Sequence, residues 1–325
     1  MTEPEAPIEL SVERVRTGDV DTRVTTITLD SAETVERDSV FVLVAGVGVA
    51  ATYFEFLAPL LARHGTVYAL DLPGFAGMPR PHVPPTISFF ADQVEAVIAH
   101  LGLSDPVLIG HSMGTQVVTE VLVRHPEYSN AVLVSPVINE AEARLGVQAV
   151  RFTQAASHES VHLALTAFSA YLLCGVVYFL TVLPFMMRYR ISARVPLVRA
   201  RLLFIRGEFD RTSPRRFHSR LVRAARRSSR WEIEGAAHSI INGHAVGVAA
   251  LTRRLLDDDL SPKGRLTADE ARVPEPRHGD PAMVLSAVGS RAAEWLSALR
   301  GDDLGVAKAK RTHAKLLWRA FTGRD

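Results

Sequence analysis

A short serine motif is the feature of this 325-residue chain that points most directly to chemistry. The run Gly110-His111-Ser112-Met113-Gly114 has the pattern G-x-S-x-G and lies between a strand-like apolar run and an amphipathic helical segment. In such a turn the serine hydroxyl is lifted to the edge of the sheet, and the glycines leave room for a sharp backbone. The helix that follows favours negative charge at its start. We therefore expect Ser112 to be a nucleophile.

A serine hydroxyl is a weak nucleophile, so it needs a base, and the base needs an acid that orients it. In strand–turn–helix architectures with this motif the order along the chain is serine, acid, histidine. Arg201–Asp210 reads as a strand followed by an acidic turn, and Gly235–Ser239 as a histidine-bearing loop after the next strand. The sequence thus predicts Asp210 as the acid and His238 as the base.

Two rival residues stay open at this point. Glu208 lies two residues before Asp210 and is the alternative acid. His244 is the alternative base, although it falls at the start of a helical pattern. His111, next to the serine, is expected to pack against its surroundings.

Alternating strand and helix patterns predict an α/β fold, in which a mostly parallel sheet positions these residues between helices on both faces. The expected strands are Glu9–Arg16 and Arg23–Leu29, as an antiparallel edge pair, then Val40–Ala45, Val67–Leu70, Pro106–Ile109, Ala131–Val134, Arg201–Ile205 and Arg230–Ile233. The expected helices are Tyr53–Leu61, Ile87–Leu101 with Ser88 as its cap, Met113–Arg124, Pro214–Arg227 and Asn242–Asp257. Together they predict an eight-stranded sheet.

The same patterns divide the chain into three parts. Residues 1–137 and 200–260 form the core, and residues 138–199 form an inserted helical lid. Residues 261–325 are expected to be a polar linker, Ser261–Pro281, followed by a basic extension with helices over Met283–Leu299 and Leu304–Phe321. The last helix is expected to dock on the body or to fray, or else to lie on a membrane or bind a partner.

Composition excludes several classes of protein. Cys174 is the only cysteine, so neither a disulfide scaffold nor a cysteine-ligated zinc site is expected. Residues 1–262 contain no lysine, which excludes a P-loop or Schiff-base lysine there. A net charge of +2 gives no reason to expect nucleic acid as a partner. The N-terminus lacks a secretory pattern, and we expect a cytoplasmic protein, with peripheral membrane contact allowed.

Five motifs in order make the chain resemble the lid-bearing α/β-hydrolases, the group of esterases, lipases, carbon–carbon bond hydrolases and cofactor-free haloperoxidases. They are Val42–Gly48, Asp71–Gly74, Gly110–Gly114, Gly207–Asp210 and Gly235–His238. Dehalogenases and epoxide hydrolases of this fold carry an aspartate where Ser112 stands, so those two activities are not expected.

The resemblance also implies an oxyanion hole made by the backbone N–H groups of Val47 and Met113. One departure concerns Ala45, which stands where the family usually has a histidine that braces this loop. Asp71 corresponds to an aspartate that organises the Pro73-Gly74 turn, and we favour that structural role over a catalytic one.

A long uncharged segment suggests the nature of the substrate. Ser160–Met187 has no formally charged side chain. We expect it to form lid helices over the site, with Phe168, Leu172, Val176 and Phe179 lining a pocket for an apolar acyl group. A membrane span is the alternative by length, but it would split one sheet across a bilayer. Fourteen arginines between Arg188 and Arg230 read as solvated surface or as an anion-binding rim.

The resulting prediction is a serine hydrolase that acts on an ester or related acyl substrate, needs no cofactor or metal, and has a small apolar molecule as its partner. A carbon–carbon bond hydrolase or a perhydrolase would use the same triad. A non-catalytic binding protein of this fold is the alternative from another class. The oligomeric state is not predicted.

Overall fold

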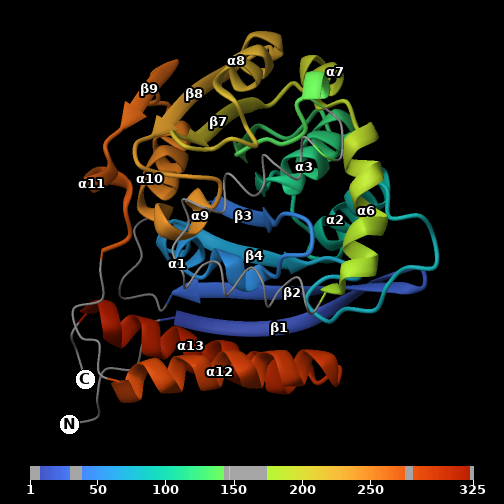
Figure 1. Cartoon of the computed structure of the whole chain (residues 1–325), viewed down its shortest axis with the longest axis vertical. Helices are drawn as coiled ribbons and strands as arrows, with labels where there is room; N and C mark the ends of the chain where they lie inside the picture. Colours follow the sequence, from blue (N-terminus) through green and yellow to red (C-terminus); the bar gives the residue numbers. More distant parts are fainter. Residues whose placement is uncertain (1–7, 30–38, 143–145, 147–173, 275–280, 323–325) are drawn as a thin grey trace.

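One mixed sheet organises the part of the chain that the computed structural model describes, residues 8–29, 39–142, 146, 174–274 and 281–322 (Figure 1). Its strand order is β1-β2-β4-β3-β5-β6-β7-β8-β9. β2 pairs antiparallel with β1 and with β4, and every other pair is parallel. The strands are β1 (Ile8–Thr17), β2 (Val20–Leu29), β3 (Ser39–Val44), β4 (Gly65–Asp71), β5 (Val107–His111), β6 (Asn130–Val134), β7 (Arg201–Gly207), β8 (Ser228–Ile233) and β9 (Lys263–Leu266).

The ninth strand corrects the predicted count of eight. β9 lies within the segment that was expected to be a linker, and it pairs with β8 at the edge of the sheet. Only Leu266 of its four residues is buried, whereas Lys263 and Arg265 are exposed. Edge strands are often short and charged, because charged side chains prevent pairing with a further strand. Their composition therefore resembles that of a polar linker. The short helix α11 (Ala268–Ala271) follows it, with a capping box at Thr267.

Helices cover both faces of the sheet and bury a separate apolar core on each side. Alternate residues of the central strand β3 divide between these cores: Val42 and Val44 belong to one, Phe41 and Leu43 to the other. Strands buried on both faces have the continuous apolar runs that the sequence displays. The helical elements of the core are η2 (Ala51–Phe54), α1 (Leu57–Ala62), α2 (Ile87–His100), α3 (Met113–Arg124), α8 (Arg215–Ala224), α9 (Ile240–Gly243) and α10 (Ala245–Leu256).

The cap of α2 differs from the prediction. Thr86, not Ser88, precedes the helix in an extended conformation, and its hydroxyl accepts a hydrogen bond from the Phe89 N–H at 3.0 Å. Ser88 lies in the first turn, where its hydroxyl contacts Arg124. Both residues are common caps, and the backbone conformation of Thr86 decides between them.

Helical segments connect β6 to β7, where the lid is predicted. They are η3 (Glu140–Glu142), α6 (Val176–Arg188), α7 (Ile191–Arg194) and η4 (Val195–Leu197). α6 begins after Gly175 and continues through Pro184. Residues 147–173, with Phe168 and Leu172, lie outside the described residues, so the lid as a whole stays a prediction. Among the helices that are described, none combines the length and hydropathy needed to cross a membrane.

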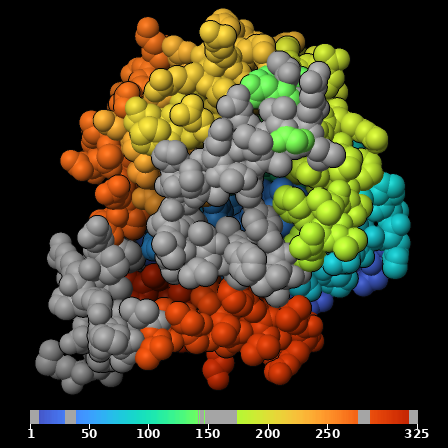
Figure 2. Space-filling view, viewed as in Figure 1, coloured from blue at the N-terminus to red at the C-terminus, as the bar shows by residue number. Residues whose placement is uncertain are grey.

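A C-terminal hairpin packs along the antiparallel edge of the sheet. Its helices, α12 (Pro281–Leu299) and α13 (Asp303–Thr322), lie side by side beneath β1 and β2 in Figure 1 and form a band along the bottom of the face in Figure 2. The Arg311 guanidinium donates to the Leu10 carbonyl of β1 at 2.8 Å. The expected docking of the last helix on the body is therefore confirmed.

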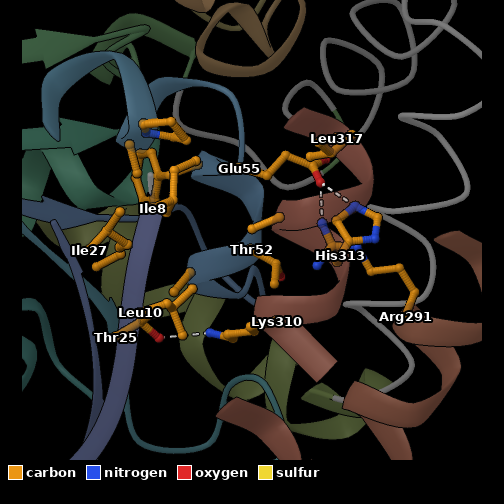
Figure 3. Close-up of a pocket in the computed structure, with 16 residues that line it drawn as sticks. Ile8, Leu10, Thr25, Ile27, Thr52, Glu55, Arg291, Lys310, His313 and Leu317 are labelled. Carbon is orange, nitrogen blue, oxygen red and sulfur yellow. Dashed lines mark hydrogen bonds and ion pairs between the residues drawn. The ribbon is translucent and has the colours of Figure 1, made fainter. Parts of the chain in front are cut away.

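Buried charges join this hairpin to the core across a small cavity (Figure 3). Glu55, which follows η2, accepts from Nε2 of His313 at 3.0 Å and pairs with Arg291. The Lys310 ammonium donates to Oγ1 of Thr25 at 2.8 Å. Lys310 is 5% exposed, so its charge depends on partners within the protein.

Candidate active site

The serine motif forms a sharp turn between β5 and α3. Ser112 has φ 55° and ψ −122°, a conformation that L-residues rarely adopt and that costs free energy. A side chain on Gly110 would collide with the Gly114 carbonyl, and one on Gly114 would collide with the Val44 carbonyl of β3. Both glycines of the motif are therefore required by close packing. The surrounding strands hold Ser112 at the N-terminus of α3, and the Ser112 N–H donates to the Val134 carbonyl of β6 at 3.1 Å.

The loop after β3 passes directly against this serine. A Cβ on Gly46 would lie 3.1 Å from the Ser112 Cβ and 3.4 Å from its Oγ. Val47 follows in this loop and Met113 follows the serine, and both residues are buried. The two predicted oxyanion donors therefore come from the two backbone segments that border Ser112. Ala45, where a bracing histidine is usual, is buried at the end of β3.

Asp71 anchors the far end of the same loop. One carboxylate oxygen accepts from the Ala51 N–H at 2.5 Å. The other lies 3.4 Å from Arg23 Nη1 and 3.7 Å from the Lys310 ammonium. Asp71 is 1% exposed, so these two cations compensate its buried charge. Asp71 precedes the Pro73-Gly74 turn, and its side chain also contacts the loop after β3 and the C-terminal hairpin.

An aspartate–histidine pair is formed by the loops after β7 and β8. Nδ1 of His238 lies 3.2 Å from Oδ2 and 3.3 Å from Oδ1 of Asp210. Asp210 is 1% exposed and His238 is 7% exposed. Burial alone would raise the pKa of Asp210, but the charge and hydrogen bonds of His238, with the Thr212 hydroxyl, outweigh it and hold that pKa well below its usual range. Asp210 is thus an ionised carboxylate facing an imidazole.

Thr212 completes this pair and was not identified from the sequence. Its Oγ1 lies 2.6 Å from Asp210 Oδ1 and 2.7 Å from His238 Nδ1. The backbone N–H groups of Thr212 and Ser213 also donate to Oδ1, at 2.9 and 3.0 Å. An aspartate side chain often accepts a hydrogen bond from the backbone N–H two residues further on. That spacing was the available signal, but the contact with His238 requires the fold.

His111 supports the histidine loop, which goes beyond the packing role expected for it. Its Nε2 donates to the His238 carbonyl at 2.9 Å, and the two ring centroids are 4.9 Å apart. The Ser135 hydroxyl donates to the same carbonyl at 3.2 Å. Burial and the neighbouring His238 lower the pKa of His111 to about 3, so its ring is neutral. These contacts place His238 beside the residue that precedes Ser112.

The rival residues have other contacts. Glu208 accepts from the Gly235 N–H at 3.1 Å and from Arg265 at 2.9 Å, which ties the acid turn to the histidine loop from outside. His244 lies between α9 and α10, and burial near Arg272 lowers its pKa to about 4. The geometry therefore pairs Asp210, and not Glu208, with His238.

Of the four residues expected to line the substrate pocket, two are described. Val176 begins α6 and is 64% exposed, and Phe179 packs partly buried against the apolar core that contains Val42 and Val44. α6 itself is held against the body: the Tyr178 hydroxyl donates to the Pro73 carbonyl at 3.1 Å, and Gln116 of α3 donates to the Met186 carbonyl at 2.9 Å. Contact of Val176 and Phe179 with substrate stays a prediction.

Comparison with known proteins settles the family. A model of the alpha/beta hydrolase family matches residues 41–251, a range that contains Ser112, Asp210 and His238. The chain belongs to the α/β-hydrolase family. This α/β-hydrolase also matches a protein of Oryza sativa subsp. japonica named a probable 1-acylglycerol-3-phosphate O-acyltransferase, with 31% identity over 119 residues. The match covers 35% of this chain and 28% of the rice protein, well under two thirds of its length.

Two solved structures illustrate the likeness of the fold. An esterase from Thermogutta terrifontis is 17% identical, with a TM-score of 0.62 over 78% of this chain and 100% of its own. The 2-hydroxy-6-oxo-6-phenylhexa-2,4-dienoate hydrolase of Rhodococcus sp. strain RHA1 is 18% identical, with a TM-score of 0.61 over 77% of this chain and 98% of its own. At this identity the two structures speak to the fold of this α/β-hydrolase alone.

Proposed function

We propose that this enzyme hydrolyses an ester or related acyl substrate through an acyl-enzyme on Ser112. The observation that carries the proposal is the joint placement of a strained serine at the start of α3 and a buried Asp210–His238 pair in the adjoining loops. A strained nucleophile with a base that a third group orients is the arrangement that activates serine. Asp210, His238 and Ser112 are assigned as acid, base and nucleophile.

In the proposed reaction, Ser112 Oγ attacks the substrate carbonyl while His238 accepts the serine proton at Nε2. Asp210 keeps the Nδ1 proton on its own side of the ring and stabilises the imidazolium that forms. The Thr212 hydroxyl, between the two, supports the same tautomer. The backbone N–H groups of Val47 and Met113 receive the negative charge on the carbonyl oxygen.

His238 then gives its proton to the leaving group, and the carbonyl reforms as an acyl ester of Ser112. Water, deprotonated by His238, attacks this ester and releases the acid. Every proton in the cycle passes through one imidazole. The orientation of His238 is therefore the property on which the rate depends, and four groups serve it: Asp210, Thr212, His111 and Ser135.

An apolar acyl group is the second part of the proposal. Within the predicted lid, the described residues 174–187 carry no charged side chain, and Val176, Val177 and Leu180 of α6 are each more than half exposed. Each methylene buried in such surroundings contributes about 0.8 kcal/mol. Three additional methylenes in the acyl chain of the substrate would raise kcat/KM by roughly 60-fold if they are fully buried in the transition state.

The same exposed face of α6 is proposed as the point of peripheral lipid contact. The basic residues of α13 were the alternative, but Lys310 and Arg311 bind Thr25 and the Leu10 carbonyl. Vesicles of neutral phosphatidylcholine provide the test, because they lack charge to attract the basic surface. We expect co-sedimentation that is lost in Val177→Glu. Equal co-sedimentation of the two proteins would assign the contact elsewhere.

A panel of p-nitrophenyl esters from acetyl to octanoyl tests the function, with Ser112→Ala as the background. We expect turnover that rises with chain length and is absent in the variant. Activity on carbon–carbon bonds or on peroxide formation with no ester turnover would assign the alternative chemistry of the same triad. Transfer of the acyl group to an alcohol in preference to water would assign an acyltransferase. Binding of esters without turnover would assign a binding protein.

A further inference from the structure

A second concave surface borders the acid turn, and neither Ser112 nor His238 lines it. It is a groove of about 440 Å³ between α8 and strands β7 to β9. Five cationic side chains and one carboxylate line it: Arg206, Arg215, Arg230, Lys263, Arg265 and Glu232. This excess of positive charge is local, since the whole chain carries a net charge of only +2.

One row of these charges is internally balanced. Arg206, Glu232 and Arg265 face each other across three adjacent strands. Glu232 pairs with Arg206, and it lies 2.7 Å from Arg215 of α8 and 3.9 Å from Arg265. Arg265 also lies 2.9 Å from Glu208. This row needs no ligand to explain it.

The next row is not balanced. Arg230 of β8 and Lys263 of β9 are register partners, so two like charges stand on neighbouring strands. Arg230 donates to the Ser219 hydroxyl at 2.8 Å. Within the described part of the chain, neither cation has a carboxylate within 4.0 Å. Neighbouring like charges in a sheet destabilise it, and an anion between them would remove that cost.

A buried histidine lines the same groove. His218 of α8 is 3% exposed, and among the described residues its Nε2 has no hydrogen-bond partner. Burial and the charge of Arg206 lower its pKa to about 3, so the ring is neutral and can donate from Nε2 without taking up a proton. A buried polar atom without a hydrogen-bond partner is unfavourable, and a ligand oxygen at this position would satisfy it.

We propose that this groove binds a phosphate group, held by Arg230 and Lys263 with a hydrogen bond from His218. Phosphate suits the site because it carries up to two charges and offers several acceptor oxygens to donors on different elements. The site is separate from the ester-cleaving residues. At its inner end, Arg206 donates to the Ser213 and Asp210 carbonyls at 2.9 and 3.0 Å, which places the groove behind the acid turn.

Calorimetric titration of inorganic phosphate into the full-length protein, at constant ionic strength, tests the site. We expect one saturable site whose affinity falls at least roughly tenfold in Arg230→Gln/Lys263→Gln, since the double variant removes two charge-assisted contacts. Both residues are exposed, so the variant should fold and keep the ester hydrolysis of the wild type. Arg223→Gln is the matched control, an exposed α8 arginine outside the groove, and it should bind like the wild type.

Two further arms identify the source of the phosphate. The ligand is a soluble phosphate ester if glycerol 3-phosphate binds as inorganic phosphate does and if the wild type and the double variant bind vesicles equally. The ligand is a lipid headgroup if the wild type binds vesicles that contain phosphatidic acid more strongly than vesicles of phosphatidylcholine alone, and if the double variant loses this difference. No saturable phosphate binding by the wild type, or equal weakening in Arg223→Gln, would overturn the proposal.

Discussion

Replacing Asp210 by asparagine should impair catalysis far more than replacing Glu208 by glutamine. Oδ1 of Asp210 accepts from the Thr212 N–H, the Thr212 hydroxyl and the Ser213 N–H. An asparagine in this place will keep its carbonyl oxygen toward these three donors. Its amide NH₂ then faces Nδ1 of His238, where Oδ2 now lies at 3.2 Å. A donor at that position favours an unprotonated Nδ1, which puts the ring proton on Nε2, the nitrogen that must accept the serine proton.

The size of the effect follows from this inverted tautomer. The same substitution in a serine protease triad lowers kcat by about 10⁴-fold, or about 5.4 kcal/mol of transition-state stabilisation. Glu208 makes its contacts at the surface with a side chain that is 23% exposed. Partly exposed pairs contribute about 0–1 kcal/mol, so Glu208→Gln should cost at most about fivefold.

The assay is kcat/KM on the best p-nitrophenyl ester at neutral pH for wild type and both variants. Thermal unfolding of each protein separates loss of catalysis from loss of fold. Asp210→Asn should melt near the wild type, because the carbonyl retains the three donors of the turn. The reverse ranking of the two variants, or a loss below about tenfold in Asp210→Asn, would refute the assignment of the acid.

Three further predictions concern the surroundings of the site. Thr212→Val removes the hydroxyl beside His238 Nδ1, while Asp210 keeps its two backbone donors. We expect kcat to fall about tenfold, which corresponds to the low end for a hydrogen bond to a charged group. A kcat equal to the wild type would assign Thr212 to folding alone. Lys310→Met removes a buried cation from beside Asp71, so urea unfolding should show that the free energy of unfolding falls by about 3 kcal/mol. Lys308→Met is the control, and at its exposed position of α13 it should leave stability unchanged. Equal effects of the two substitutions would contradict the buried network. The pKa values of buried His111 and His218 are lowered to about 3, so as pH falls below 6.5 the unfolded chain takes up protons first and stability decreases. From pH 6.5 to about 5.5 the two histidines together should remove about 2 kcal/mol of stability in urea titrations, and His111→Asn should halve that loss. An unchanged slope would show that His111 does not contribute.

The sharp turn at Ser112 and the central strands of the sheet could be predicted from the sequence, because local constraints determine them. The helix predicted over Met113–Arg124 has the same bounds as α3, and the two glycines around Ser112 are required by contacts that any such turn makes. Continuous apolar runs identified the central strands because both of their faces are buried. The two C-terminal helices were likewise predicted from their periodicity.

Contacts between distant segments could not be predicted in this way. The roles of Thr212 and His111 depend on loops that meet only in the folded sheet, and the Lys310–Asp71 pair joins residues far apart in the chain. β9 was taken for a linker because an exposed edge strand has few apolar residues to mark it. α6 continues through Pro184 although a proline inside a helix usually kinks or breaks it.

Covalent labelling tests the central claim most directly. A fluorophosphonate reacts only with an activated serine, forming a phosphonyl ester with the release of fluoride. Intact-protein mass measurement should show one adduct per chain, and peptide mapping should place it on Ser112. Ser112→Ala should carry no adduct while melting at the temperature of the wild type. An adduct that persists in Ser112→Ala, or a folded wild-type protein that stays unlabelled, would contradict the assignment of Ser112 as the nucleophile.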